Sequence, residues 1–403
     1  MSLTVSCYRC GRQYQSVHRT RCDCEEPLWM DTLTEAFDWN PNPTSTGMWS
    51  YTDVLPFDSP PGICASAGGT PLTFSAGLSD DVGCSLWLKD ETQNPTGTYK
   101  DRGSAMSVTY ATQHEIDAIG TVSVGNMAMS TAATAASAGL GCLVLVPSTI
   151  PPERVELIGQ YEPTLLEVHG DYGRLYYDAL ALNETEDVLF VNGDSPLRLE
   201  GYKTLAYEVC EQFHPETPDA LVLPASSGGH ACGVWKGLRE LHDAGAIESI
   251  PRLYLVQASA ANPIATAYEA DSDVVEPVEQ GKTIAYSISN GDPPSGNRAL
   301  AAVRRTGGSV TSVSDAEILD AKRALATRSG LCVEPASAVT VAGIRTWVQS
   351  GEIDSDETVV AVLTGTGFKE MGRPDAAGDV GRRIDQRELR SGVRAAVESM
   401  RSD

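Results

Sequence analysis

The chain has 403 residues, of which 41% are apolar and 21% are charged, and its 54 acidic and 30 basic residues give a net charge of −24. This length predicts about two to three folding units, with cores large enough to need no cross-links. The negative charge repels phosphate backbones and anionic lipid, which argues against nucleic acid and membrane surfaces as partners.

Lysine is rare in this composition. Only seven of the basic residues are lysines, at positions 89, 100, 203, 236, 282, 322 and 369, so arginine outnumbers lysine by more than three to one. An acidic, lysine-poor surface favours a halophilic protein from an acidic proteome, because concentrated salt screens its self-repulsion. A merely acidic enzyme is the alternative.

No segment has the pattern of a targeting signal or a membrane anchor. The N-terminal sequence MSLTVSCYRC lacks a basic-then-apolar signal, and the most apolar run, from Met127 to Pro147, is broken by hydroxyl residues and glycines. Six of the ten cysteines are scattered through apolar stretches, as is usual for small buried side chains in a reducing compartment. We expect a cytoplasmic protein.

The first 30 residues hold the other four cysteines, as Cys7-x2-Cys10 and Cys22-x-Cys24. Two close pairs of thiolates can supply the four sulfurs of a tetrahedral zinc site, which predicts a small zinc ribbon over residues 1–30. Four sulfurs leave no open coordination position, so this zinc would be structural. Four reduced or disulfide-paired cysteines are the alternative.

A connector rich in Pro, Ser and Gly follows, and from about residue 85 strand-like and helix-like stretches alternate. The short apolar runs are CLVLVP, TLLEV, VLFV, ALVLP, RLYLVQA and VVAVL, and the helical stretches are 130–138, 152–160, 199–213, 230–242, 315–329 and 336–348. The alternation predicts βαβ units, and hence an α/β fold with open, mostly parallel twisted sheets covered on both faces. The end of the chain is charged, with a helix near 385–400.

In such folds ligands bind at the carboxyl ends of the strands, and three turns at those ends have unusual chemistry. The first is Asn94-Pro-Thr-Gly-Thr-Tyr-Lys-Asp-Arg-Gly103, in which Lys100 opens a helix that runs to about Gln113. The positive end of the helix dipole favours a neutral amine, the form that a nucleophile or Schiff-base lysine needs. Residue types alone also allow a solvated first-turn lysine.

The second turn, Ser123-Val-Gly-Asn-Met-Ala-Met-Ser130, lies between a short strand at 121–124 and an alanine-rich helix. Asn126 offers an amide to a ligand there, although an Asn or Ser helix cap has the same pattern. The third turn, Pro224-Ala-Ser-Ser-Gly-Gly-His230, exposes N–H groups at a helix N-terminus, which suits a phosphate. A flexible βα turn is the alternative reading of it.

Five segments occur in one order along the chain. They are NPTGTYKDRG, SVGN, the loop 225–230, Val333-Glu-Pro-Ala-Ser337 and Leu363-Thr-Gly-Thr-Gly-Phe-Lys-Glu370. This order resembles the pyridoxal-phosphate (PLP) enzymes of the tryptophan-synthase-β fold type, PLP fold type II, and the threonine synthase family most closely. The N-terminal cysteines, Gly68-Gly-Thr-Pro71 and Arg198-Leu-Glu-Gly-Tyr-Lys-Thr204 are similar to the archaeal type. The resemblance spans about residues 5–370.

The resemblance implies how a PLP cofactor would be held. Lys100 would bind it covalently and then act as the base, and Asn126 would hydrogen-bond the pyridine 3-oxygen. Thr364 would hydrogen-bond the pyridine nitrogen. A hydroxyl there leaves this nitrogen unprotonated, which suits elimination and replacement reactions. The cofactor phosphate would be held by Ser226, Ser227, Gly228, Gly229 and His230.

The resemblance further implies the reaction of O-phospho-L-homoserine and water to give L-threonine and phosphate. Arg198 would contact the anionic group of this small amino-acid substrate, and Ser123 and Ser130 would lie near its carboxylate. A homo-oligomer, namely a dimer, is expected.

The same resemblance implies two α/β domains behind the ribbon. The expected segments are the ribbon at 1–30, a connector with part of the large domain at 31–84, the segment with the cofactor lysine and the small domain at 85–200, the large domain with the phosphate loop at 201–370, and a peripheral tail at 371–403.

Three features depart from the family pattern. Met127 and Met129 stand where small or hydroxylated residues are usual, the phosphate loop reads SSGGH, and Ser195 replaces an asparagine that often precedes the arginine motif. These changes leave open a related enzyme of β-elimination or β-replacement, such as a serine/threonine dehydratase or a sulfur- or sulfite-incorporating synthase.

Overall fold

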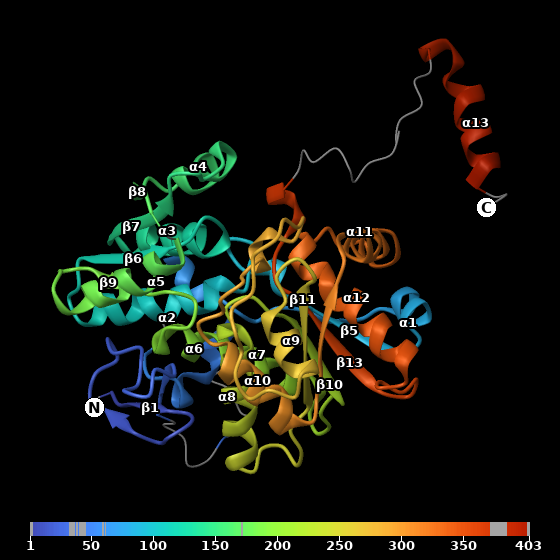
Figure 1. The fold of residues 1–403 in the computed structure, drawn as a ribbon. Coiled ribbons are helices and arrows are strands. Elements are labelled where there is room, and N and C mark those ends of the chain that lie inside the picture. Colours follow the sequence, from blue (N-terminus) through green and yellow to red (C-terminus); the bar gives the residue numbers. More distant parts are fainter. Residues whose placement is uncertain are drawn as a thin grey trace. The chain divides into compact units, whose positions relative to one another are not determined.

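The computed structural model describes residues 3–31, 37, 39, 46–58, 60, 62–170, 172–370 and 385–400. The chain divides into two units, Met1–Lys369 and Glu370–Asp403, and the described residues of the first form three sheets. Figure 1 shows these sheets with their helices. Within the described residues, no helix combines the length and the apolarity that crossing a membrane requires.

The largest sheet has the described strand order β12-β11-β10-β13-β5-β4. All neighbours are parallel except the edge strand β4, which is antiparallel to β5. The strands are β4 (Leu72–Phe74), β5 (Ser85–Asp90), β10 (Ala220–Pro224), β11 (Arg252–Ala258), β12 (Val310–Val313) and β13 (Thr358–Leu363). The central strands consist mostly of consecutive apolar residues, with no polar-apolar alternation, because both faces of the sheet are buried.

Helices cover both faces of this sheet. They are α1 (Ala76–Val82), α7 (Thr204–Phe213), α8 (Gly229–Asp243), α9 (Pro263–Glu269), α10 (Gly296–Thr306), α11 (Asp315–Ala324) and α12 (Pro335–Ser350). Along β13, Val360 and Val362 pack into one core with α7, α8 and α10, whereas Val359 and Ala361 pack into a second core with α11 and α12. This division follows from the pleat, which points successive side chains to opposite faces.

A second sheet has four parallel strands among the described residues, in the order β8-β7-β6-β9. They are β6 (Ala118–Val122), β7 (Gly141–Pro147), β8 (Thr164–Val168) and β9 (Leu189–Phe190). Helices α3 (Asn126–Ala138) and α4 (Pro152–Gly159) pack on one face and α5 (Tyr172–Ala181) on the other. In Figure 1 this sheet and its helices are coloured teal to green.

Two further helices, α2 (Lys100–Gln113) and α6 (Pro196–Tyr202), pack closely against each other. A Cβ atom at Gly201 would lie 2.1 Å from the carbonyl oxygen of Arg102, and one at Gly103 would lie 2.7 Å from the ring of Tyr202. These contacts require glycine at both positions. The helix that begins at Lys100 is therefore locked to α6.

The N-terminal segment forms a small antiparallel sheet in the order β2-β1-β3, with β1 (Val5–Cys7), β2 (Gln13–Tyr14) and β3 (Leu28–Met30). Val5 and Leu28 share a core with Met106 of α2. The rings of Trp29 and Trp235 lie 5.5 Å apart, which joins this sheet to α8.

The predicted α/β fold with mostly parallel sheets is confirmed. Each of the six apolar runs contains a strand, while the helix expected at 199–213 is divided into α6 and α7 at Lys203. The stretch 315–329 is α11 followed by a π-helical turn, and the helix expected at 130–138 already begins at Asn126.

The second unit holds the turn η9 (Gln386–Glu388) and α13 (Leu389–Met400). Parts of the connector and of the tail, at residues 32–36, 38, 40–45, 59, 61, 371–384 and 401–403, lie outside the described residues. The expected boundaries at 30, 84, 200 and 370 stay predictions.

Candidate active site

Lys100 lies at the carboxyl ends of β5 and β13. Thr98 forms a β-bridge with Gly365, and the N–H of Tyr99 donates a hydrogen bond to the carbonyl of Thr364 at 3.0 Å. The turn before the lysine is fixed by Asp101, whose carboxylate accepts hydrogen bonds from the N–H and the hydroxyl of Thr96, both at 2.6 Å. The lysine therefore begins its helix from a turn that is tied to the sheet.

The amine of Lys100 lies among aromatic rings. Its Nζ donates a hydrogen bond to the hydroxyl of Tyr99 at 2.5 Å and lies 5.7 Å from the centre of the Tyr202 ring. Removal from water, and then the positive charge of Arg198, lower the pKa of Lys100 to about 7 against an opposing effect of Glu334. Much of this amine is therefore neutral, and nucleophilic, near neutral pH.

The loop between β10 and α8 reaches Lys100 through His230. The His230 imidazole stacks on the Tyr99 ring with centroids 3.9 Å apart, and burial lowers its pKa well below the usual range, so the ring is neutral. Both of its nitrogens are buried without a hydrogen-bond partner among the described residues. Because a buried imidazole without a partner is costly, this ring is a candidate to hydrogen-bond a ligand.

Two glycines give this loop its shape. Gly228 has a φ of +85°, and a Cβ atom there would lie 2.7 Å from the carbonyl oxygen of Ser295. A Cβ atom at Gly229 would lie 2.3 Å from the carbonyl oxygen of Gly193. The side chains at 226–227 are partly exposed. Since the first N–H groups of a helix have no partner within it, the loop can bind an anion.

Asn126, the first residue of α3, is held between a carboxylate and an ammonium. Its Nδ2 donates a hydrogen bond to Oε2 of Glu334 at 2.8 Å, and its Oδ1 accepts one from Nζ of Lys369 at 2.6 Å. Glu334 directly precedes α12, and Lys369 belongs to the short helix η7 (Gly367–Glu370). Segments that are far apart in sequence thus meet around this amide.

Thr364 follows directly after β13 and is buried. Its hydroxyl lies 3.0 Å from that of Ser337 in α12, and either group can donate the hydrogen bond. The N–H of Gly365 also donates to the Ser337 hydroxyl, at 2.9 Å. Ser337 therefore fixes both the side chain and the backbone at this strand end.

Arg198 of α6 is fully buried and bound to hydroxyl groups. Its Nη1 donates to Ser104 at 3.0 Å and its Nη2 to Thr131 at 2.6 Å, while the hydroxyl of Ser130 donates to that of Ser104 at 2.7 Å. No carboxylate forms an ion pair with Arg198 in the described part of the chain. Its charge is thus not neutralised by an ion pair within these residues.

Ser123 and Ser130 occupy different surroundings. The hydroxyl of Ser123 accepts a hydrogen bond from the N–H of Gly125 at 3.2 Å and shapes the turn before α3. Ser130 lies one turn into α3, fully buried beside Ser104. Of the two, the structure brings Ser130 to Arg198.

The departures from the family pattern are buried as well. Met127 and Met129 are 8% and 3% exposed. The hydroxyl of Ser195 accepts a hydrogen bond from the N–H of Asn192 at 2.9 Å, so it closes the turn before α6. A Cβ atom at Gly193 in that turn would lie 3.2 Å from the hydroxyl of Ser227 and 3.9 Å from the sulfur of Met127. The turn before α6 therefore lies beside both Met127 and the loop 225–230.

A buried cluster of four charges anchors the first turn of α2. The guanidinium of Arg102 donates to Glu91 at 2.7 Å and to Glu208 at 2.6 Å, and Lys89 donates to Glu208 at 2.8 Å. Arg102 and Lys89 hold the pKa of Glu208 well below its usual range despite burial. All four charges are balanced inside the protein.

The four N-terminal cysteines converge. Their Sγ atoms all lie within 4.8 Å of one another. The Sγ atoms of Cys7 and Cys24 lie 3.6 Å apart, and those of Cys10 and Cys22 lie 3.5 Å apart. A tetrahedron of sulfurs at the usual zinc distance of about 2.3 Å has edges of about 3.8 Å, so the four thiols fit that ion.

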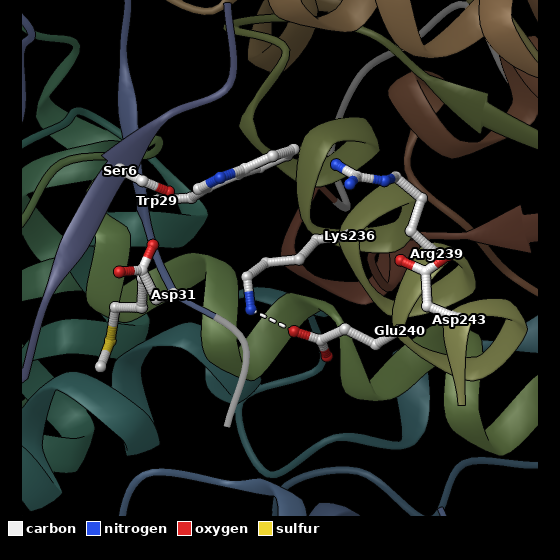
Figure 2. A pocket seen from close by; sticks show the side chains of 8 residues that line it. Ser6, Trp29, Asp31, Lys236, Arg239, Glu240 and Asp243 are labelled. Atoms are coloured by element: carbon white, nitrogen blue, oxygen red, sulfur yellow. Dashed lines mark hydrogen bonds and ion pairs between the residues drawn. The ribbon is translucent and has the colours of Figure 1, made fainter. Parts of the chain in front are cut away.

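The cavity in Figure 2 is a different place. It has a volume of about 160 Å³ and lies between the N-terminal sheet and the second half of α8. Its lining comprises Ser6, Trp29, Met30, Asp31, Lys236, Arg239, Glu240 and Asp243. None of the predicted site residues belongs to this lining.

The model of one protein family, described as pyridoxal-phosphate dependent enzyme, matches residues 63–365. This stretch includes Lys100, Asn126, the loop 225–230 and Thr364. The chain belongs to this family.

Curated relatives of the chain are threonine synthases. That of Methanocaldococcus jannaschii is 32% identical over 381 residues, which cover 92% of this chain and 93% of that protein. That of Methanosarcina acetivorans is 34% identical and covers 91% of this chain and 92% of its own. A third, from Mycobacterium bovis, is 35% identical over 335 residues, or 81% and 89% of the two chains.

Solved structures share the fold at lower identity. An O-ureido-L-serine synthase has a TM-score of 0.66 at 22% identity and covers 83% of this chain and 99% of its own. A threonine deaminase from Solanum lycopersicum has a TM-score of 0.64 at 17% identity, with coverage of 87% and 95%. These likenesses show the fold of the PLP-dependent family.

The residues of this chain fit the cofactor of the family. A lysine of lowered pKa lies near the buried imidazole of His230, which has no hydrogen-bond partner among the described residues and belongs to the first turn of α8, directly after the glycine-containing loop. The lysine amine can form a covalent bond with an aldehyde, and the N–H groups of the loop can hold a phosphate. The chain thus has groups suited to both the aldehyde and the phosphate of PLP.

Sequence reasoning missed three residues of the site, namely Tyr99, Glu334 and Lys369. Glu334 and Lys369 lie inside two of the segments that carry the family resemblance, and Lys369 is one of only seven lysines. That scarcity was the available signal for Lys369. Tyr99 carried none beyond its place next to Lys100.

Proposed function

We propose that this enzyme is a threonine synthase, which converts O-phospho-L-homoserine and water into L-threonine and phosphate. The proposal is supported by the threonine synthases that match more than nine tenths of this chain at 32% and 34% identity. The observation that carries it is Arg198, a buried guanidinium with no carboxylate partner among the described residues, whose charge is felt at Lys100. Such a group suits a substrate that carries a phosphate.

The cofactor, when bound, supplies an electron sink for negative charge that develops on the carbon skeleton of an amino acid. Lys100 would hold it covalently, the loop 226–230 would hold its phosphate, and Asn126 and Thr364 would hydrogen-bond its ring. The hydroxyl of Thr364 is hydrogen-bonded to that of Ser337, so the cofactor ring would meet a neutral hydroxyl there and no carboxylate.

Lys100 is suited to move protons during the reaction. With a pKa of about 7, its amine both accepts and gives up a proton at neutral pH. The nearby Tyr99 hydroxyl, 2.5 Å from the amine, orients it. Ser104 joins Arg198 to Ser130. We place the anionic group of the substrate against this guanidinium, with Ser123 and Ser130 near the substrate carboxylate.

The four cysteines are proposed to hold one structural zinc ion. Their mutual distances suit tetrahedral thiolate ligation, and all four positions are taken by the protein. Elemental analysis of the purified enzyme should give one zinc per chain, and a Cys22→Ala variant should lack it. Zinc-free wild-type enzyme would reject the site.

We further infer a cytoplasmic homo-oligomer, namely a dimer, whose acidic surface is adapted to high salt. The support for the salt adaptation is the net charge of −24 and the small number of lysines. Light scattering at high salt tests the dimer, and a monomeric mass would contradict it.

The substrate is tested by a paired assay. The purified enzyme is incubated in high salt with PLP and O-phospho-L-homoserine, and phosphate and threonine are measured. We expect equal amounts of both products. In parallel, L-serine and L-threonine are supplied and keto acids are measured. Keto acid without release of phosphate would overturn the proposal in favour of a dehydratase.

A further inference from the structure

Lys369 joins three segments of the active site. Its Nζ donates hydrogen bonds to Oδ1 of Asn126 at 2.6 Å and to the carbonyl oxygens of Gly97 and Thr96 at 3.2 and 3.3 Å. An ammonium has three N–H donors, whereas a neutral amine has two, so three acceptors at these distances indicate the charged form. The lysine thus links η7 to the turn before Lys100 and to the start of α3.

This contact fixes which way the amide of Asn126 points. An ammonium is a donor only, so it must face the oxygen of the amide, and a carboxylate is an acceptor only, so Glu334 must face the nitrogen. The two contacts demand the same orientation. One of the two N–H bonds of Nδ2 is used by Glu334, and the other is left to donate.

We propose that Lys369 is a positioning residue that holds Asn126 as a hydrogen-bond donor toward an anionic oxygen of the bound cofactor. Without the ammonium, only Glu334 holds the amide, so orientations that turn the amide oxygen toward an anionic oxygen, and repel it, become more populated. The inference rests on the PLP-dependent family and on our placing of Asn126. It does not depend on which amino acid is the substrate.

The test is a titration of cofactor-free enzyme with PLP, followed by absorbance. Lys369→Met removes the donors, Lys369→Arg keeps the charge and N–H groups, and Lys282→Met is the matched control, because Lys282 is exposed. We expect Lys369→Met to weaken cofactor binding about 10- to 100-fold and to shift the absorbance of the bound cofactor. Lys369→Arg should restore part of both, and Lys282→Met should change neither.

A double-mutant cycle separates positioning from a structural role. If Lys369 acts through Asn126, most of its effect on the dissociation constant disappears in an Asn126→Ala background. Should Lys369→Met fail to fold by circular dichroism, Lys369→Gln carries the same test, because its shorter amide cannot reach all three acceptors. Binding equal to that of Lys282→Met, or a full effect in the Asn126→Ala background, would overturn the proposal. Neither readout requires turnover, so loss of the threonine synthase assignment would leave this result intact.

Discussion

Lys100 and His230 show how the surroundings of a side chain set its chemistry. Each is kept from its charged form by desolvation, and the two are linked by the ring of Tyr99, which contacts both. A neutral amine can react with an aldehyde, and a neutral imidazole has one N–H that can donate to an anion. Perturbed groups that gather in this way are characteristic of active sites.

The lowered pKa of Lys100 predicts the pH dependence of cofactor capture. Only the neutral amine attacks an aldehyde, so the rate at which cofactor-free enzyme binds PLP should rise about tenfold per pH unit below pH 7 and level off above it. Stopped-flow absorbance measures this rate. Nα-acetyl-lysine, whose ε-amine is free and unshifted, serves as the control, since the rate at which it reacts with PLP should still rise at pH 10. A plateau that appears only near pH 10 in the enzyme would contradict the shift.

At the scale of elements, the position of Lys100 depends on how α2 is anchored. Arg102 lies two residues further along the helix and is bound on both sides by buried carboxylates. Glycines at 103 and 201 bring α2 against α6, which carries Arg198. The helix that presents the lysine and the helix that presents the arginine are therefore fixed as one piece.

Removal of Arg102 should destabilise the enzyme strongly. An Arg102→Met variant leaves Glu91 buried without an ion-pair partner among the described residues and leaves Glu208 with Lys89 alone, which costs about 3–5 kcal/mol of the free energy of unfolding. Urea denaturation measures this quantity. Arg304→Met is the control, because the carboxylates that pair with Arg304 are highly exposed, and it should lose less than about 1 kcal/mol. Similar losses in the two variants would contradict the anchoring role.

Sequence alone was sufficient where the signal is local. The strands expected in the six apolar runs, the turn before Lys100 and the glycine loop before α8 are each contained in a short stretch, and the structure has them there. Partners from distant segments were not predictable, because Glu334 and Lys369 meet Asn126 across 208 and 243 residues. The division of the helix at Lys203 was missed for the same reason, since its buried ammonium pairs with Glu200 and, across the core, with Glu240.

At the scale of the whole molecule, the charge of −24 opposes the ligands that we propose. An anionic cofactor and a phosphorylated substrate must approach through a repulsive field, and only local groups such as Arg198 and the loop N–H groups attract them. Of the seven lysines, 89, 203 and 236 are buried in ion pairs and 100 and 369 lie in the site. Scarce lysine is thus concentrated where structure or chemistry requires it.

This balance predicts that salt strengthens substrate binding. Raising KCl from about 0.1 to 1 M shortens the screening length from about 10 to 3 Å, which suppresses the repulsion of a phosphorylated substrate far more than the contacts within the site. The KM for O-phospho-L-homoserine should fall as KCl rises, while sucrose of equal osmolality should leave it unchanged. A KM that is constant or rises with KCl would count against this account.

The central claim is that one lysine, Lys100, carries the cofactor of this enzyme. Reduction of the PLP-loaded protein with borohydride fixes the linkage, and peptide mapping by mass spectrometry identifies the labelled residue among the seven lysines. The account predicts the label on Lys100 and on no other lysine. A label on a different lysine, or a Lys100→Ala variant that keeps the yellow absorbance of bound cofactor, would contradict it.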